Sequence, residues 1–212
     1  TRDGDNRSSI SYIDVEAGNP RHVLYRHGQP ILPLGALGTF DDAGMMPSSI
    51  VTHGGCKYLY YTGWNVRQSV PYHNAIGLAV SEDGGNSFRR YGEGPVLGLT
   101  VNEPYFTATA TVLVEGDRWR NWYAACTRWE MIDGHPEPFY HLKYAESRNG
   151  VDWDRRGLVA IDYRDESEAG IVRAAVIAEE GGYRMWYATR QGKGYRNDKA
   201  QSYRIGYAES AD

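Results

Sequence analysis

An internal repeat of about sixty residues is the feature that most constrains how this chain folds. Each copy contains a short strand rich in aromatic residues, and the three copies lie at 57–63, 119–125 and 183–189. Their shared tyrosines, Tyr61, Tyr123 and Tyr187, are 62 and 64 residues apart. Repeats of this period are typical of chains that assemble several copies of one supersecondary unit, so we expect several similar sheets.

Each repeat has the pattern of a small antiparallel sheet. An apolar run and a turn precede the aromatic strand, and a second strand ending in serine follows it. The preceding runs are 48–52, 108–114 and 171–178, and the following strands are 76–81, 142–147 and 205–210. Asp83-Gly84 and Asn149-Gly150 then suit hairpin turns that need positive φ and lead to a fourth strand. Four short strands per repeat predict a β-propeller blade, because the strands of a sandwich do not repeat in sequence.

The sequence therefore predicts an all-β chain with one partial propeller domain over 1–212 and blades near 40–97, 103–160 and 168–212. Residues 25–32 resemble 91–97, the exit from a fourth strand. Segment 10–32 is thus expected to be an orphan outer strand that belongs to the last blade of a closed ring. About two further blades would close that ring, and the open edges predict association with a second chain. The alternative is a complete small β-protein with three sheets.

Composition excludes several classes of partner. The 23 basic and 27 acidic residues give a net charge of −4 without a Lys/Arg run, which argues against nucleic acid. No apolar stretch approaches the length of a membrane span, and residues 1–5 do not resemble a signal peptide. We therefore expect a soluble chain, and its compartment stays open. Cys56 and Cys126 lack metal-type spacing, so we expect free thiols, with a disulfide as the alternative.

Acidic residues precede the first strand of every repeat: Asp41 and Asp42, then Glu103, then Glu168. The first strand of each propeller blade lines the central channel, so these carboxylates are expected at one end of that channel. Such a set can split a glycosidic bond: one carboxylate acts as the acid, a second acts as the base or nucleophile, and the third adjusts the pKa and the position of the reacting groups. For each residue alone, the alternative is a solvated side chain or a turn cap.

With these acids, residues 20–212 resemble the five-bladed propeller glycosidases, the superfamily of arabinanases and β-xylosidases (family 43) and of invertases and levansucrases (family 32). The resemblance implies Asp42, or Asp41, as base or nucleophile, Glu103 as the residue that adjusts pKa and orientation, and Glu168 as general acid. Two departures leave the substrate undefined. Glu103 stands where these families favour Asp, and the Asn-Asp-Pro and Arg-Asp-Pro motifs of the invertases are absent.

Further residues are candidates for binding substrate, besides Asp41. Trp64 and Trp129 follow the aromatic strands and have flat rings that stack on sugars, although packing between blades is the alternative. Arg173 stands where an apolar residue is expected and would hold a carboxylate or a hydroxyl, unless it forms a structural ion pair. His73 precedes the second strand of its repeat and either reaches the channel or is an ordinary histidine.

The leading hypothesis is a glycoside hydrolase-like protein that acts on a poly- or oligosaccharide. The alternatives are a non-catalytic carbohydrate-binding or scaffold propeller, and a glycoside phosphorylase relative that uses phosphate in place of water. We expect no cofactor, and a Ca²⁺ in the channel is suggested by analogy only. Residues 81–88 resemble the Asp box of sialidases, a turn-forming element that we expect to be structural.

Overall fold

The computed structural model describes residues 2–211, so the two ends of the predicted domain lie outside the described part. Within that part the chain is all-β, and thirteen strands are connected by turns and loops without a helix. The strands are β1 (Ile13–Glu16), β2 (Asn19–Arg26), β3 (Gly44–His53), β4 (Cys56–Val66), β5 (Tyr72–Ser81), β6 (Arg89–Arg90), β7 (Thr107–Glu115), β8 (Arg118–Ile132), β9 (His135–Ser147), β10 (Val159–Ile161), β11 (Glu168–Glu179), β12 (Gly182–Gln191) and β13 (Arg204–Ser210).

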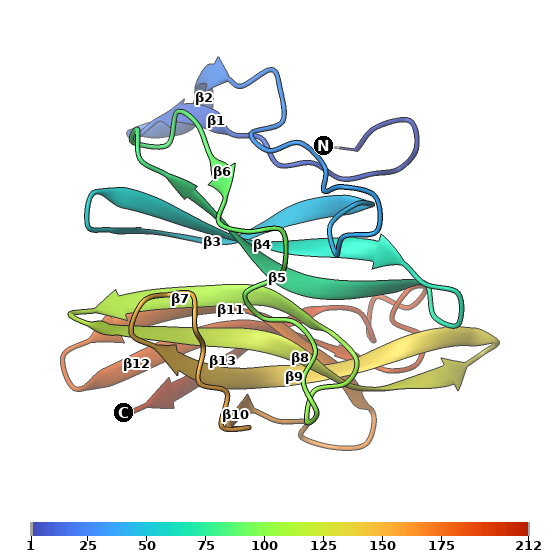
Figure 1. Cartoon of the computed structure of the whole chain (residues 1–212). Helices are drawn as coiled ribbons and strands as arrows, with labels where there is room; N and C mark the ends of the chain where they lie inside the picture. Colours follow the sequence, from blue (N-terminus) through green and yellow to red (C-terminus); the bar gives the residue numbers. More distant parts are fainter. Residues whose placement is uncertain (1, 212) are drawn as a thin grey trace.

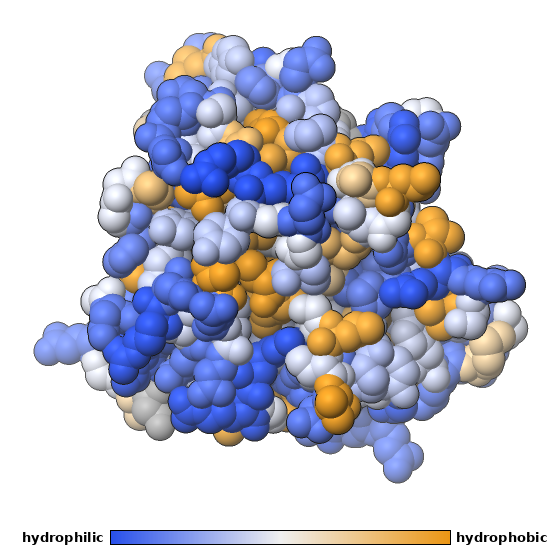
Figure 2. All heavy atoms as spheres, in the orientation of Figure 1, coloured by the Kyte–Doolittle hydropathy of each residue, from blue (hydrophilic) through white to orange (hydrophobic). Residues whose placement is uncertain are grey.

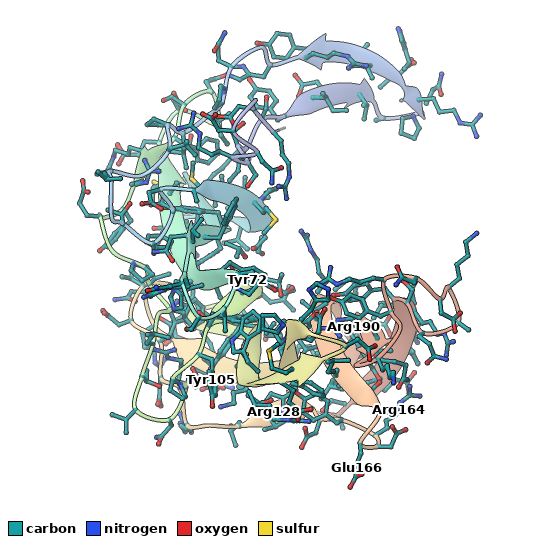
Figure 3. All side chains as sticks on the ribbon, turned by 90° about the vertical axis from the view of Figure 1, so that its right-hand side faces the viewer. Tyr72, Tyr105, Arg128, Arg164, Glu166 and Arg190 are labelled. Carbon is teal, nitrogen blue, oxygen red and sulfur yellow. The ribbon has the colours of Figure 1, made fainter. Side chains whose placement is uncertain are left out.

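Each repeat forms one antiparallel blade. Blade 1 contains β3 to β6, blade 2 contains β7 to β10, and blade 3 contains β11 to β13. A single parallel pairing of Gly170 with Tyr140 joins blades 2 and 3 into one sheet. The blades follow one another around an arc that does not close (Figure 3). The predicted all-β partial propeller is therefore confirmed.

The N-terminal segment forms a hairpin of its own. β1 pairs only with β2 among the described strands, and nearly all residues of this hairpin are exposed. Figure 1 places the hairpin at the end of the molecule opposite to β13. The flanking residues Ile10 and Leu32 are buried in the core of blade 1 and anchor the segment there. That this segment completes a last blade stays a prediction.

The alternation of side chains along each strand supplies two apolar faces per blade. Trp119 and Tyr123 of blade 2 pack with Tyr60 of blade 1 in one buried cluster. Trp122 and Leu142 on the other face pack with blade 3 in a second cluster. On the outer surface, apolar residues are interspersed with hydrophilic ones (Figure 2). Blade-to-blade packing of aromatic and aliphatic side chains is thus the main apolar contribution to stability.

The innermost strands carry a β-bulge at equivalent positions. Thr109 in β7 and Arg173 in β11 have left-handed φ angles of 51° and 57°, each within a bulge. The bulges release backbone groups from their own sheet. The Thr109 N–H donates to Thr62 Oγ1 of blade 1 at 2.9 Å, and Thr111 Oγ1 donates to the carbonyl of Ala174 in blade 3 at 2.5 Å. These hydrogen bonds join β7 to β4 of blade 1 and to β11 of blade 3.

Cys56 and Cys126 are free thiols, as predicted. Among residues 2–211, no three or more His, Cys, Asp or Glu side chains are grouped so that they could hold a metal ion. The described chain also contains no helix of the length and apolarity that crossing a membrane requires.

The turn at Gly150 provides a test of blade packing. Its φ is +72°, and an added Cβ would lie 2.6 Å from the Trp119 ring and 2.7 Å from the Tyr60 hydroxyl, which donates to the Gly150 carbonyl. We expect Gly150→Ala to lower the free energy of unfolding by about 3 kcal/mol, from overpacking and backbone strain. Gly84→Ala is the control, because its φ is +78° but no atom lies within 4 Å. Urea unfolding measures both variants, and an equal loss of unfolding free energy in Gly150→Ala and Gly84→Ala would contradict this packing.

Candidate functional site

The acids Asp41, Glu103 and Glu168 are buried where the chain enters its three blades. Their exposed fractions are 1%, 4% and 2%. Each carboxylate bonds to residues of its own blade, and within residues 2–211 no hydrogen-bond partner is shared between two of them. The structure therefore places the three acids at equivalent points of the repeat, but it does not join them in one hydrogen-bonded network.

Asp41 holds the loop before β3 onto blade 1. Arg90 in the outermost strand approaches its Oδ2 to 2.8 Å, and the Tyr61 hydroxyl donates to the same oxygen at 3.1 Å. Thr39 Oγ1 donates to Oδ1 at 3.0 Å. Burial, with the Asp41 charge adding to it, raises the pKa of Tyr61 above its ordinary value, so this phenol stays a donor. A buried carboxylate needs such compensation, because an unpaired one is costly.

Glu103 has the same surroundings in blade 2. The Tyr123 hydroxyl donates to Oε1 at 2.9 Å, and Arg155 lies 2.8 Å from Oε2. Lys143 adds a second cation, 3.0 Å from Oε1. The acid and its tyrosine are 20 residues apart in both blades. We call this repeated arrangement of acid, tyrosine and arginine the blade clamp. It fixes the chain at the start of blades 1 and 2.

Asp42 and Glu168 differ from the clamp residues. Asp42 is half-buried, its Oδ2 accepts the Gly38 N–H at 2.9 Å, and no ion pair reaches it within the described chain. Glu168 accepts a short hydrogen bond from the Thr189 hydroxyl and a 2.8 Å bond from the Arg164 N–H. The exposed Arg164 guanidinium lies 3.2 Å from its Oε1. These two carboxylates are therefore less tightly compensated by cations than Asp41 and Glu103.

The predicted binding residues lie in different surroundings. Trp64 donates its Nε1–H to Ser8 Oγ at 2.9 Å and so holds the N-terminal segment. His73 is partly buried, both its ring nitrogens lack a partner in the described chain, and burial, with Arg67 adding to it, lowers its pKa. Trp129 meets the ring of Tyr72 edge-on at 5.4 Å. The Trp129 ring therefore contacts a neighbouring blade.

Trp129 belongs to a cluster from all three blades that the sequence did not indicate. The three-blade cluster consists of Tyr72 from blade 1, Trp129 and Tyr140 from blade 2, and Arg190 and Tyr203 from blade 3. Figure 3 shows Tyr72 and Arg190 on the inner side of the arc. The Tyr140 and Tyr203 hydroxyls are 2.5 Å apart, and Arg190 Nε donates to Tyr140 at 3.0 Å. Burial, with Tyr203 nearby, raises the pKa of Tyr72 to about 12.

Arg190 is a buried cation with neutral partners. Its guanidinium donates to the Tyr140 hydroxyl and to the carbonyls of Pro138 and Gln191, and it stacks on Tyr195 at 3.9 Å. Arg190 therefore connects β12 to the β8–β9 hairpin. The cluster offers aromatic rings and hydroxyls at the meeting point of the blades, which are the groups that bind sugars.

Glu137 fastens the same hairpin to the loop of blade 3. Burial opposes its charge, but bonds from Arg196 and Tyr195, at 3.0 and 2.7 Å, outweigh burial and hold its pKa below the ordinary value. Because the pKa of Glu137 is lower in the folded state than in the unfolded state, its ionised carboxylate stabilises the fold at pH values above the unfolded-state pKa. This stabilisation is lost as the pH falls through the folded-state pKa.

We therefore expect Glu137→Gln to lower the free energy of unfolding by about 2 kcal/mol at pH 7 and to flatten its fall below about pH 4.5. Urea unfolding at pH 7 and at acid pH measures both effects. The exposed Glu166→Gln is the control and should leave both values unchanged. An unchanged pH slope in Glu137→Gln would contradict the assignment.

The sequence was compared with known proteins. No family model matches the chain. Two relatives from Mycobacterium tuberculosis, the uncharacterized proteins MT1551 (strain CDC 1551 / Oshkosh) and Rv1502 (strain ATCC 25618 / H37Rv), are each 37% identical over 211 residues. The match covers 100% of this chain and 67% of each relative.

Solved structures show a likeness at low identity. A glycoside hydrolase matches 96% of this chain with a TM-score of 0.70 and 15% identity, over 57% of its own length. The sucrose-6-phosphate hydrolase of Lactobacillus gasseri matches 90% with a TM-score of 0.64 and 14% identity, over 36% of its length. A family 117 glycoside hydrolase of the marine bacterium Zobellia galactanivorans matches 78% with a TM-score of 0.57 and 18% identity, over 52% of its length. The chain thus spans about half the length of the first and the third, and the likeness confirms the propeller fold.

Proposed function

Because this chain belongs to the same family as MT1551 and Rv1502 and has the propeller fold of glycoside hydrolases, we propose that it acts on glycosidic bonds of an oligo- or polysaccharide. One observation carries the proposal: each of the three blades begins with an acid beside its innermost strand, namely Asp41–Asp42, Glu103 and Glu168. Hydrolysis of a glycoside needs two carboxylates on either side of the scissile bond.

The proposed roles follow from the surroundings of each acid. Asp42 is the base or nucleophile, because its carboxylate lacks a cation that would weaken its attack. Glu168 is the general acid, oriented by Thr189 and the backbone of Arg164. Glu103 acts as a positioning residue, since two cations compensate it inside blade 2.

Aromatic rings of the three-blade cluster would then bind the sugar. Tyr72 and Trp129, which are partly buried, offer apolar ring surface, and the exposed Tyr203 offers a hydroxyl. Asp41 serves the blade clamp and is assigned no catalytic role. The fold by itself assigns no chemistry, so these roles rest on the placement of the acids.

A second candidate is a non-catalytic carbohydrate-binding propeller. The observation that favours it is the burial of Asp41, Glu103 and Glu168, each of which is bonded inside its own blade. Such acids stabilise blades without any reaction. The aromatic groups of the three-blade cluster would bind sugar equally well in both cases.

One experiment separates the candidates. The protein is incubated with a panel of aryl arabinofuranosides, xylosides, galactosides and mannosides, with and without inorganic phosphate, and chromophore release is followed. Tryptophan fluorescence measures binding of the corresponding free sugars in parallel. Release without phosphate supports hydrolysis, and release that requires phosphate supports phosphorolysis. Sugar binding without release from any substrate would overturn the enzymatic proposal in favour of the binding propeller.

A further inference from the structure

The buried carboxylates at the starts of the blades and in the β8–β9 hairpin are compensated by cations. The pairs are Asp41 with Arg90 at 2.8 Å, Glu103 with Arg155 at 2.8 Å and with Lys143 at 3.0 Å, Glu168 with Arg164 at 3.2 Å, and Glu137 with Arg196 at 3.0 Å. Arg190 adds a positive charge that only neutral oxygens meet. The cations that accompany these buried carboxylates are therefore engaged in ion pairs, and none of those pairs involves Arg173.

Arg173 is a further cation, and it differs from those above because no hydrogen bond or ion pair holds its guanidinium within the described chain. It lies on β11, the innermost strand of blade 3, five positions after Glu168 in the sequence. The residue is exposed, and within residues 2–211 no ion pair or hydrogen bond of its guanidinium is formed. The structural ion pair that the sequence allowed for is therefore absent from the described chain. A guanidinium in this state is available to an external anion.

The backbone at Arg173 explains why its side chain leaves the usual alternation. The residue has a φ of 57° inside the bulge between Val172 and Ala175. Bulges re-aim a side chain and occur next to active sites. Thr109 has the same conformation in β7, so the bulge belongs to the repeat, but blade 3 places a cation there.

Resting on the proposed function, we propose that Arg173 binds an anionic group of the sugar, so that the site selects acidic saccharides. The planar guanidinium fork matches the two oxygens of a carboxylate, and it also matches a phosphate or sulfate ester. A neutral saccharide would leave this charge without a partner.

Binding by NMR titration tests the proposal without any need for turnover. The ligands share one ring and differ in charge: a uronate, a 6-phosphate, a 6-sulfate and a neutral methyl glycoside, in the gluco and galacto series. We expect at least one anionic sugar to bind at least tenfold more tightly than the neutral one, and the best anion identifies the source of the charge. Equal affinity for neutral and anionic sugars, or no binding of any anionic sugar, would overturn the proposal.

Variants locate the effect. Arg173→Asn removes the charge and keeps a residue that tolerates the left-handed conformation, and it should reduce binding of the anionic sugar about tenfold or more. Arg173→Lys should restore part of the affinity. Arg204→Gln, an exposed arginine on β13 of the same blade, is the matched control and should change nothing. An equal loss in the control would assign the preference to general charge. Hydrolysis of neutral glycosides with no preference for anionic sugars would agree with the proposed function and would contradict the role of Arg173.

Discussion

Replacing Arg90 by leucine should lower the free energy of unfolding by about 3–5 kcal/mol, because the substitution leaves the Asp41 carboxylate buried without its cation. Asp41 cannot move to water, since its loop is also held by Tyr61 and Thr39. The loss should appear as a lower urea midpoint with an unchanged slope.

Arg89→Leu is the matched control for this prediction. Arg89 is the adjacent residue of β6, but it is exposed and pairs with the exposed Glu82 at 2.6 Å. Exposed pairs contribute about 0–1 kcal/mol, so the control should remain near wild-type stability. A loss of less than about 1 kcal/mol in Arg90→Leu would contradict the structural role of the blade clamp.

Replacing Glu168 by glutamine should reduce the rate on a glycoside with a sugar leaving group by about 10²–10⁴-fold. Glutamine keeps the size of the side chain and one acceptor oxygen, so the Thr189 bond to Oε1 is retained, whereas the bond from the Arg164 N–H to the second oxygen is lost. What is lost is the proton that the leaving oxygen requires. Substrate binding should therefore change little, which separates this effect from unfolding.

Glu166→Gln is the control, because Glu166 lies two positions away and points outward from the arc in Figure 3. Its activity should equal that of the wild type. If both variants lose activity to the same degree, the effect belongs to the loop before β11. If neither loses activity, the general acid lies elsewhere.

The sequence predicted the blades well because the repeat is a local property. Every blade brings its own strands and turns, so a period read from Tyr61, Tyr123 and Tyr187 fixes where each sheet recurs. The N-terminal hairpin has no counterpart within the repeats, and its two strands were expected as one. A single unpaired segment offers no periodicity from which a turn can be read.

The candidate site was predicted only in part. The repeat located the acids, but their partners are distant: Arg90 follows Asp41 by 49 residues and Arg155 follows Glu103 by 52. Proximity of that kind depends on how four strands pair. Threefold repetition thus pointed to catalysis, whereas in Asp41 and Glu103 the structure shows blade clamps.

The three-blade cluster was not predicted from the sequence, for a different reason. Its members occupy unlike positions in the repeat; Arg190, for example, corresponds to Trp64 and Cys126 in the other blades, counted from the shared tyrosines. A comparison of the repeats does not identify such residues, because no equivalent residue type recurs in the other blades. Their contacts cross blades, as between Tyr72 and Trp129, and so they follow from the curvature of the arc rather than from any local pattern.

The most direct test of the proposed chemistry compares leaving groups in Glu168→Gln. A dinitrophenyl glycoside departs without protonation, whereas an alkyl or sugar leaving group needs a general acid. We predict a near wild-type kcat/KM on the dinitrophenyl substrate and a loss of kcat/KM of about 10²–10⁴-fold on the alkyl glycoside, because kcat/KM reports the first step, in which the leaving group departs. Equal losses of kcat/KM on both substrates, or no loss on either, would contradict the assignment of Glu168 as the general acid of a glycoside hydrolase.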